Sequence, residues 1–359
     1  MRVAIVCDWL IGGGAEKVVE QLHKMYPEAP IYASTATHEW RERLNGKVIT
    51  GYLNWWPLAK LRKFLPLLRI LWFRRLDLSK FDQVISSSGA EAKFVTVESP
   101  AIHVSYIHAP THYYWRRYDE YIERPGFGKL DWLARFGLEL LVGPLRKMDY
   151  RAAQTPDYLI ANSSYTQSEI KKYYQRDSTV IFPPVDTERF GSAKSDEPRS
   201  GFVIAGRQTP YKRFDIAVEA CTKLKLPLIV IGTGPDNFRL KRLAGRSVTF
   251  IRASDEDMPL QFARAEAFLF PGVDDFGVVA VEAMAAGTPV IAYKGGGAVD
   301  YVKPGKTGEF FAEQTTESLA KTLQGFHSEK FNESTIKKFA SSFSVKHFRV
   351  AFQQFIKSI

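Results

Sequence analysis

The sequence has very few cysteines and no recognisable signal peptide, and both absences narrow the class of protein. Only two of its 359 residues are cysteines, Cys7 and Cys221. Two cysteines in separate apolar runs build no disulfide framework, so we expect a reducing cytosol. Residues 1–6 are soon followed by the acidic Asp8, so this apolar run is too short to be a signal peptide. We expect them to form a buried strand instead.

The charge of the chain is strongly positive. Lys and Arg number 49 against 39 Asp and Glu, which gives a net charge of +10. A basic surface suits an anionic partner such as nucleic acid, anionic lipid or a phosphorylated substrate. No nucleic-acid recognition motif is present, so we expect no nucleic-acid partner. The length allows two domains, and 45% apolar and 25% charged residues are typical of soluble globular proteins.

Short apolar runs alternate with helical patterns along the chain. The runs are rich in Val and Ile, which is typical of buried parallel strands, and the helical patterns between them indicate βαβ crossovers. The predicted strands are 2–7, 30–33, 83–86, 103–107, 158–161 and 179–182, then 201–205, 226–231, 247–251, 267–270 and 289–293. This pattern predicts an α/β protein with two doubly wound, Rossmann-like domains.

Prolines mark the expected domain boundary. Pro183 and Pro184 interrupt regular structure, and the polar stretch 191–200 follows. We therefore predict an N-terminal domain over residues 1–190 and a C-terminal domain over residues 191–340. The remaining residues, 341–359, have apolar residues at helical spacing and predict a terminal helix that packs back on the first domain.

One segment departs from this organisation: residues 55–73 read WWPLAKLRKFLPLLRILWF. Its charges prevent it from spanning a bilayer, but Trp, Leu and basic residues together suit a membrane interface. Anionic head groups would add roughly 1 kcal/mol per basic residue. An ordinary helix with its apolar side inward is the alternative. The residues predicted to contact membrane or acceptor are Trp55, Trp56, Arg62, Lys63, Arg69 and Trp72.

Glycines follow the first predicted strand. Gly13 and Gly14 lie just before a helix, where they let a ligand approach the backbone and where free amides favour an anion. The spacing differs from the GxGxxG dinucleotide fingerprint. A tight turn without a ligand explains these glycines about as well.

Two cations follow the first strand of the second domain. Arg207 comes directly after Gly206, and Lys212 lies a few residues further on. Ligands of parallel sheets bind at the carboxyl ends of strands. Arg207 can bind two phosphate oxygens and Lys212 adds a point charge, so a diphosphate fits. The alternative is a solvated basic turn.

Two carboxylates lie further along the second domain. Asp274 is in a loop, and Glu282 is in an apolar helix that starts near Gly277 and stops at Gly287. A carboxylate on an apolar helix is costly unless it has a partner, which ribose hydroxyls or a basic side chain would supply. The amides of Gly277 and Val278 begin this helix and suit a phosphate or sugar oxygen.

A histidine marks the first domain. His108 follows a predicted strand at its carboxyl end, where it can hydrogen-bond a ligand in the cleft between the domains. The alternative is a structural histidine whose hydrogen bonds are all made with neighbouring protein groups. His103 and His112 do not complete a zinc site with it, because no metal-binding helix motif frames them.

These segments together resemble family 4 of the retaining glycosyltransferases, which have the GT-B fold of two Rossmann-like domains facing a cleft. The resemblance covers nearly the whole chain and rests on the order and spacing of the motifs. Segments similar to bacterial mannosyltransferases of O-antigen and exopolysaccharide assembly are Asp8-Trp9, Ser86-Ser87-Ser88, 106–110, Ala161-Asn162-Ser163, 183–186 and 210–213. Two positions depart from the pattern: Asp274 stands where the family usually has Glu, and Gly89 where close relatives have His.

The resemblance implies roles for these residues. Arg207 and Lys212 would bind the donor diphosphate, Glu282 the ribose, and His108 the transferred sugar. The first domain would bind the acceptor and the second the nucleotide sugar, with the cleft closing for catalysis. The implied catalytic residues are His108, Arg207, Lys212 and Asp274. The implied donor-binding residues are Gly13, Gly14, Gly206, Arg207, Lys212, Phe276, Gly277, Val278 and Glu282.

The implied activity is transfer of a hexose with retention, most simply of mannose from GDP-mannose, to a lipid-linked or glycan acceptor. The enzyme would be peripheral on an anionic membrane surface, at the inner face of the cell membrane, without cofactor or metal. Asp255-Glu256-Asp257 has the metal-binding form of GT-A enzymes, but Ser254 before it predicts a helix capping box. The alternatives are a UDP-sugar donor or a non-catalytic membrane-associated scaffold of the same fold.

Overall fold

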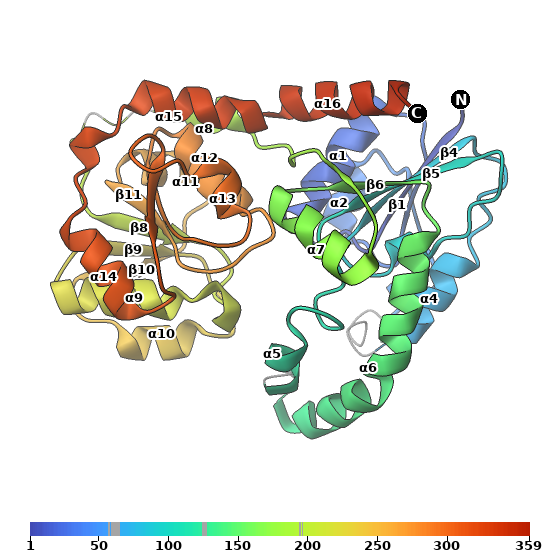
Figure 1. The fold of residues 1–359 in the computed structure, drawn as a ribbon, viewed down its shortest axis with the longest axis horizontal. Helices are drawn as coiled ribbons and strands as arrows, with labels where there is room; N and C mark the ends of the chain where they lie inside the picture. Colours follow the sequence, from blue (N-terminus) through green and yellow to red (C-terminus); the bar gives the residue numbers. More distant parts are fainter. Residues whose placement is uncertain (57, 59–64, 124–127, 194, 196) are drawn as a thin grey trace. The chain divides into compact units, whose positions relative to one another are not determined.

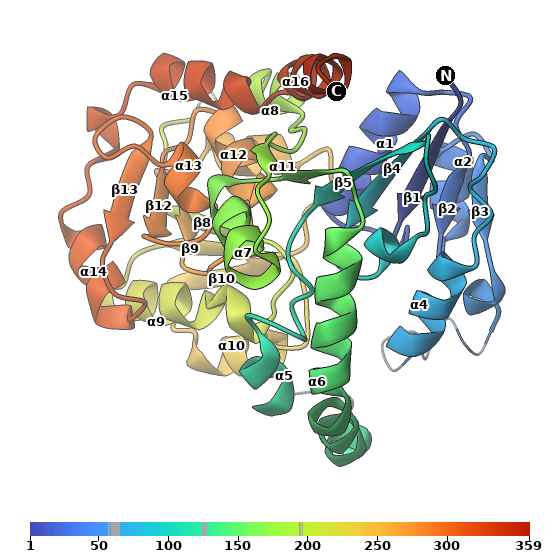
Figure 2. The same ribbon diagram turned by 45° about the vertical axis from the view of Figure 1, so that its right-hand side comes forward.

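The computed structural model describes residues 1–359 except 57, 59–64, 124–127, 194 and 196. It divides the chain into two compact units, Met1–Phe182 and Pro183–Ile359. Each unit is a parallel β-sheet with helices packed against it, as Figures 1 and 2 show. The predicted α/β class with two Rossmann-like doubly wound domains is therefore confirmed.

The sheet of the first unit has seven strands in the order β3-β2-β1-β4-β5-β6-β7, and every described pair is parallel. Every residue of β1 and β4, at its centre, is buried, as expected for a parallel sheet covered on both faces. The strands are β1 (Val3–Cys7), β2 (Ile31–Ala33), β3 (Val48–Thr50), β4 (Gln83–Ser88), β5 (Ile102–Ile107), β6 (Tyr158–Ala161) and β7 (Thr179–Val180).

Two helices of the first unit begin at a cap or a proline that the sequence supplies. Ser163 accepts a hydrogen bond from the Thr166 amide and starts α7, and Pro66 occupies the first position of α4. The α-helices of the described part of this unit are α1 (Ala15–Met25), α2 (His38–Arg43), α4 (Pro66–Arg74), α5 (Tyr118–Glu123), α6 (Asp131–Gln154) and α7 (Ser164–Tyr174).

The sheet of the second unit has six parallel strands in the order β10-β9-β8-β11-β12-β13. The direction of the chain's progress across the sheet reverses between β8 and β11. The carboxyl ends of these two strands border the crevice where sheets of this kind bind ligands. The strands are β8 (Phe202–Ala205), β9 (Leu228–Ile231), β10 (Val248–Ile251), β11 (Ala267–Phe270), β12 (Val290–Tyr293) and β13 (Gly308–Phe311).

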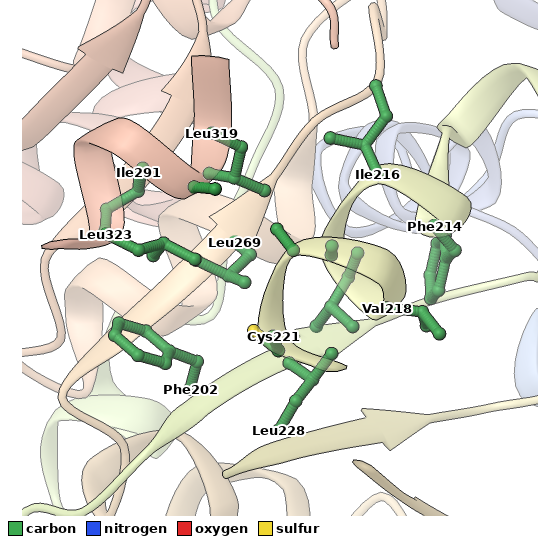
Figure 3. Packing of buried hydrophobic residues seen from close by; sticks show 14 of the residues in the cluster. Phe202, Phe214, Ile216, Val218, Cys221, Leu228, Leu269, Ile291, Leu319 and Leu323 are labelled. Atoms are coloured by element: carbon green, nitrogen blue, oxygen red, sulfur yellow. The ribbon is translucent and has the colours of Figure 1, made fainter. Parts of the chain in front are cut away.

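Helices cover this second sheet, and α9 carries much of its core. Figure 3 shows Phe214, Val218 and Cys221 of α9 in the same cluster as Leu269 of β11 and Leu319 of α14. The α-helices of the described part of this unit are α8 (Thr187–Gly191), α9 (Phe214–Leu224), α10 (Asn237–Leu243), α11 (Met258–Ala263), α12 (Val278–Ala285), α13 (Ala298–Tyr301), α14 (Thr316–Gln324), α15 (Glu333–Ala340) and α16 (Val345–Lys357).

The predicted strands are all present and differ from the observed ones only at their ends. Two edge strands were not predicted. Val48 of β3 is buried but Ile49 beside it is exposed, so β3 shows no continuous apolar run, and β13 contains Gly308 and Glu309. The predicted terminal helix is α16; its packing on the first domain stays a prediction. Within the described residues, no helix combines the length and the hydropathy that a membrane crossing requires.

Two buried ion pairs fix the loop that follows β4, residues 89–94, here called the β4 loop. Arg69 of α4 donates from Nε and Nη2 to the two carboxylate oxygens of Glu91, each at 2.8 Å. Lys93 Nζ lies 2.7 Å from Asp149 Oδ1 of α6. All four side chains are buried. The β4 loop therefore ties α4 and α6 to the carboxyl end of β4.

Burial corrects part of the predicted membrane contact. Arg69 is 3% exposed and Trp72 is 7% exposed, because α4 packs inward on the β4 loop and on the core around Phe73. Neither side chain is available to a lipid head group, so the prediction is wrong for these two. Trp55 and Trp56 are exposed. The predicted residues Arg62 and Lys63 lie outside the described residues.

Replacing Glu91 with Ala should destabilise the protein strongly. The Arg69 guanidinium would stay buried without its carboxylate, and such a loss costs roughly 3–5 kcal/mol in the free energy of unfolding. Urea unfolding followed by circular dichroism measures it. The control is Glu28→Ala, which removes an exposed partner 3.1 Å from Lys47 and should leave the midpoint nearly unchanged. Equal shifts in the two variants would contradict the structural role of the buried pair.

Candidate active site

The predicted donor-binding residues of the second unit gather at the carboxyl ends of β8 and β11. Gly206 and Arg207 directly follow β8, and Asp274 lies in the loop after β11. Because the strand order reverses between these two strands, both loops border the crevice of the sheet. We call residues 206–213 the β8 loop and residues 271–277 the β11 loop.

An ion pair joins the two loops. Lys212 Nζ lies 3.0 Å from Asp274 Oδ2, and both side chains are mostly buried. A Cβ on Gly206 would lie 3.6 Å from the same ammonium group, so Gly206, Lys212 and Asp274 are neighbours. The shorter carboxylate at position 274 thus reaches the predicted diphosphate-binding lysine. The structure brings together two residues that the sequence could only place on separate loops.

Glycine allows the two loops to approach this closely. A Cβ on Gly272 would lie 2.8 Å from Lys212 Cα, closer than real Cβ atoms come to a backbone atom. Any side chain at Gly272 would therefore push the β11 loop away from Lys212. The distance between Lys212 and Asp274 depends on this backbone-to-backbone contact.

Arg207 is exposed, and its loop is fixed by the buried neighbour Gln208. Gln208 Nε2 donates to the Gly232 carbonyl at 2.9 Å, and Gln208 Oε1 accepts from Asn237 Nδ2 at 2.7 Å. Gly232 has φ +110°, and a Cβ there would lie 2.3 Å from the Gly206 carbonyl oxygen. The sequence analysis did not identify Gln208. The feature that could have indicated this contact is the glycine pair Gly232 and Gly234 after β9.

The start of α12 is built on Gly277, as predicted. Its φ is +89°, and a Cβ would lie 2.5 Å from Phe270 Cζ and 2.7 Å from the Tyr301 hydroxyl. Only glycine fits, and it leaves the amide of Val278 in the first turn of the helix. Phe276 is buried against Tyr301, with ring centroids 5.6 Å apart. A donor contact at Phe276 therefore has to come from its backbone.

Glu282 lies inside α12 and is 8% exposed. Its neighbours Val281 and Ala283 are fully buried. A carboxylate in such a position needs hydrogen-bond donors, since its desolvation is otherwise costly.

A second glycine run, Gly295-Gly296-Gly297, was not singled out from the sequence. The Gly297 amide donates to the Asp274 carbonyl at 2.9 Å. A Cβ on Gly296 would lie 2.4 Å from that carbonyl oxygen, and one on Gly297 2.4 Å from Phe276 Cα. The loop after β12 thus lies directly on the β11 loop, and it supports Asp274 from its backbone side.

His108 follows β5 in the first unit, at the carboxyl end of its strand as predicted. Its Nε2 lies 2.7 Å from Ser87 Oγ at the end of β4, and Asn162 Nδ2 donates to its carbonyl at 2.9 Å. His103 is different: it is buried, lies 2.9 Å from Ser86 Oγ, and burial lowers its pKa to about 4. His103 is therefore a neutral structural histidine.

Asp8, at the end of β1, was not assigned a site role from the sequence, although it lies in a segment similar to the mannosyltransferases. Its carboxylate accepts hydrogen bonds from the amides of Gly89 at 2.6 Å, Ala90 at 2.9 Å and Ala92 at 2.6 Å. Burial, with the nearby Glu91 charge, raises the pKa of Asp8 to about 6 although these amides oppose the shift. Gly89 adjoins His108, since a Cβ there would lie 3.6 Å from His108 Cβ.

The glycine loop of the first unit contains its own anion. Glu16 Oε1 accepts from the Gly12 amide at 3.1 Å and from the Ile11 amide at 3.4 Å. Burial raises the pKa of Glu16, and these amides oppose that shift. Gly13 and Gly14 remain exposed at the start of α1. The Glu16 carboxylate thus accepts hydrogen bonds from the first amides of the loop, while Gly13 and Gly14 face solvent.

The capping box predicted at Ser254 is present only in part. The Asp257 amide donates to Ser254 Oγ at 3.2 Å, but the Asp257 carboxylate accepts from Ser254 Oγ at 2.8 Å and not from the Ser254 amide. These contacts form a turn before α11, whose N-cap residue is Asp257. Within the part of the chain that the structure describes, no three His, Cys, Asp or Glu side chains are grouped closely enough to hold a metal ion.

Two sheets of Rossmann-like order, with the second crevice bordered by Arg207, Lys212 and Asp274, define the GT-B class of glycosyltransferase folds. Residues 12–189 match the family described as Glycosyltransferase Family 4, and residues 185–341 match Glycosyl transferases group 1. The chain therefore belongs to the glycosyltransferases of the family 4 type.

Several characterised sequences are similar to this chain over part of its length. D-inositol 3-phosphate glycosyltransferase of Rhodococcus opacus is 31% identical over 48% of this chain and 46% of its own. GDP-mannose-dependent alpha-(1-6)-phosphatidylinositol monomannoside mannosyltransferase of Mycolicibacterium smegmatis is 30% identical over 44% of this chain and 50% of its own length. The chain thus spans about half the length of these relatives.

Solved structures are similar over the whole chain. HepE of Anabaena in complex with UDP has a TM-score of 0.73 at 18% identity and covers 100% of both chains. Sucrose-phosphate synthase of Thermosynechococcus elongatus has a TM-score of 0.72 at 17% identity and covers 100% of this chain and 99% of its own. At these identities the likeness shows the fold alone.

Replacing Gln208 with Leu should loosen the β8 loop. The Gly232 carbonyl and the Asn237 amide would lose a buried partner, which costs roughly 1–3 kcal/mol for each group. Thermal unfolding should show a clearly lower Tm than the wild type. The control is Gln353→Leu on the exposed side of α16. A Tm for Gln208→Leu equal to that of the control would show that the side chain does not fix the loop.

Proposed function

We propose that this protein is a retaining glycosyltransferase that moves mannose from GDP-mannose to a lipid-linked or glycan acceptor at the cytoplasmic face of a membrane. The observation that carries the proposal is the Lys212–Asp274 pair beside Arg207, at the crevice of the second sheet. Cations at this point suit the diphosphate of a nucleotide sugar.

The two cations have different roles in the proposed site. Arg207 is exposed, so its guanidinium can turn toward two phosphate oxygens. Lys212 is held 3.0 Å from Asp274 and lies mostly out of water. Low solvent exposure strengthens its attraction to the charge that develops on the departing diphosphate. Lys212 therefore supports the leaving group, while Arg207 binds the donor.

The remaining donor contacts follow from the elements around this pair. Glu282 is the proposed partner of the ribose hydroxyls, and the amides of Gly277 and Val278 are the proposed contacts of phosphate and sugar. Gly277 has the positive φ that brings the backbone of the β11 loop to the helix start. Asp274 orients Lys212, and its second carboxylate oxygen is the proposed contact of a sugar hydroxyl.

Retention is proposed to proceed without a protein nucleophile. The leaving diphosphate takes the proton of the incoming acceptor hydroxyl on the same face of the sugar, through a short-lived oxocarbenium ion pair. The protein then contributes positioning and charge stabilisation. His108, at the carboxyl end of β5, is the proposed contact of the transferred sugar in the first unit. We propose that no metal ion takes part.

GDP-mannose is preferred over a UDP-sugar because the similar sequences include GDP-mannose-dependent mannosyltransferases at 30% identity. Lipid-linked acceptors are favoured because the acceptor named for that relative is a phosphatidylinositol monomannoside. A UDP-sugar donor remains the alternative, since HepE, similar in fold, binds UDP. A non-catalytic scaffold of this fold would bind no nucleotide.

A donor panel tests the proposal. Purified protein, GDP-mannose or UDP-glucose, and a lipid-linked acceptor extract should release GDP much faster than UDP, and the rate should be unchanged by EDTA. Nucleotide release is measured by a coupled luminescence assay. Faster release of UDP would show that the donor is a UDP-sugar. A loss of activity in EDTA that magnesium restores would overturn the proposed metal independence. No binding of GDP or UDP in calorimetry would indicate the scaffold.

Replacing Arg207 or Lys212 with Ala should lower turnover at least tenfold, which corresponds to about 1.4 kcal/mol in the activation barrier. Each change removes a cation from the proposed diphosphate site. The control is Arg242→Ala, which removes an exposed cation of α10 in the same unit and should leave turnover unchanged. Wild-type turnover in both site variants would refute their assignment to the diphosphate.

A further inference from the structure

The first half of α6 packs on little of the first unit. No residue between Asp131 and Pro144 is buried, and the buried residues of α6 begin only at Leu145. Figures 1 and 2 both show this half of α6 extending away from the sheet, next to α5. The adjacent helix α5 has no buried residue either, and Arg135 Nε of α6 donates to its Ile122 carbonyl at 2.8 Å.

Large apolar side chains lie along this projecting half. Trp132 is 67% exposed, Phe136 60% and Leu140 65%, and Leu133 beside them is also exposed. Residues four apart on a helix lie on one side of it, so Trp132, Phe136 and Leu140 form a continuous apolar stripe. A soluble protein rarely leaves such a stripe uncovered unless something binds it.

The second half of α6, beyond the internal Pro144, carries exposed positive charge. Lys147 and Arg151 follow Leu140 at intervals of seven and four residues and are exposed. Pro144 lies inside the helix between the two halves. Trp132, Leu133, Phe136, Leu140, Lys147 and Arg151 are called the α6 face from here on. One end of this face is apolar and the other is basic.

The basic end of the α6 face borders a pocket. Arg151 lines it together with Arg74, the last residue of α4, and with Thr96 and Thr155; its volume is about 380 Å³. The Arg74 guanidinium lies 5.7 Å from the centre of the Phe94 ring, which holds it near the pocket. The pocket also has apolar lining, including Phe94 and Val97, and its two arginines suit a phosphate group.

We propose that the α6 face docks this protein on an anionic lipid bilayer. The apolar half enters the boundary between head groups and acyl chains, as Trp-, Phe- and Leu-bearing helices do. Lys147 and Arg151, with Arg74 across the pocket, bind lipid phosphates. The inference rests on the proposed membrane location of the reaction and names the surface responsible, which differs from the segment around residues 55–73.

The charge distribution favours a lipid surface over a second copy of the chain. A symmetric pair of parallel α6 helices would bring Lys147 and Arg151 against their own copies, and like charges repel. An antiparallel pair that overlaps along all of α6 would press each basic half on the other's apolar half and desolvate its charges. One that overlaps only along the apolar halves would offer no anion to Lys147 and Arg151. An anionic bilayer offers apolar chains to one half and phosphates to the other.

Vesicle flotation tests the proposal with full-length protein. Wild type should bind vesicles of phosphatidylcholine with phosphatidylglycerol, bind pure phosphatidylcholine more weakly, and lose binding to the mixed vesicles as salt rises. The triple variant Trp132→Ala/Phe136→Ala/Leu140→Ala should bind mixed vesicles at least about tenfold more weakly. Lys147→Glu/Arg151→Glu should lose about tenfold on mixed vesicles and little on neutral ones.

Matched controls lie in the second unit. Phe238→Ala removes an exposed aromatic residue of α10, and Lys225→Glu/Lys321→Glu reverses two exposed lysines. Both should bind vesicles as the wild type does. All the replaced residues of the α6 face are exposed, so an unchanged Tm should confirm folding of the variants. Vesicle binding by the α6 variants tests the docking surface, and GDP binding in calorimetry tests the proposed function. Failure of one can therefore be distinguished from failure of the other.

Three results would overturn the proposal. The first is wild-type vesicle binding by both α6 variants. The second is loss of binding in Trp55→Ala/Trp56→Ala with none in the α6 variants, which would return the surface to the segment around residues 55–73. The third is a wild-type dimer by light scattering that the triple variant converts to a monomer, which would make the α6 face a contact between copies.

Discussion

The first unit depends on charges buried in the β4 loop. Removing two ions from water costs several kcal/mol for each, and only close, well-aligned partners recover it. Glu91 is held by both ends of the Arg69 guanidinium, and Lys93 lies against Asp149, which also accepts from Trp115 and Tyr174. These contacts give the loop one conformation. The ends of β1 and β4 are fixed with it, because Asp8 accepts three of its amides.

The same network decides which helices are anchored. Arg69 draws α4 inward, and Asp149 fixes the second half of α6. The buried residues of α6 begin only at Leu145, and the apolar side chains of its first half stay in solvent. The two helices therefore differ in burial. Ile70, Trp72 and Phe73 of α4 are buried near the Arg69–Glu91 pair, whereas Trp132 and Phe136 of α6 are exposed.

The second unit fixes its site with glycines instead. Backbone lies directly on backbone at Gly272, Gly296 and Gly297, where a side chain would collide with the β8 or β11 loop. This packing leaves the Lys212–Asp274 pair and the start of α12 at the reversal of strand order. Glycine has a cost in chain entropy, which the close contact has to offset. The result is a crevice in which Lys212 and Asp274 are positioned before any ligand arrives.

Much of this arrangement followed from the sequence. Apolar runs predicted the parallel strands, since both faces of a covered sheet must be apolar, and the positions of Arg207, Lys212, Asp274 and His108 after those strands were predicted with them. The edge strands β3 and β13 were missed because their residues are partly exposed. Gln208 and Asp8 were missed as parts of the sites because their hydrogen bonds reach loops distant in the sequence.

By itself, the sequence determined the fold class, the element order and the residue types at the strand ends, because these depend on local hydrophobic pattern and turn chemistry. Tertiary structure alone decided three further points. It paired Lys212 with Asp274, buried Arg69 and Trp72, and left Trp132 exposed. The pattern of a helix shows that it has an apolar side. Which protein surface, if any, covers that side depends on contacts between residues far apart in the chain.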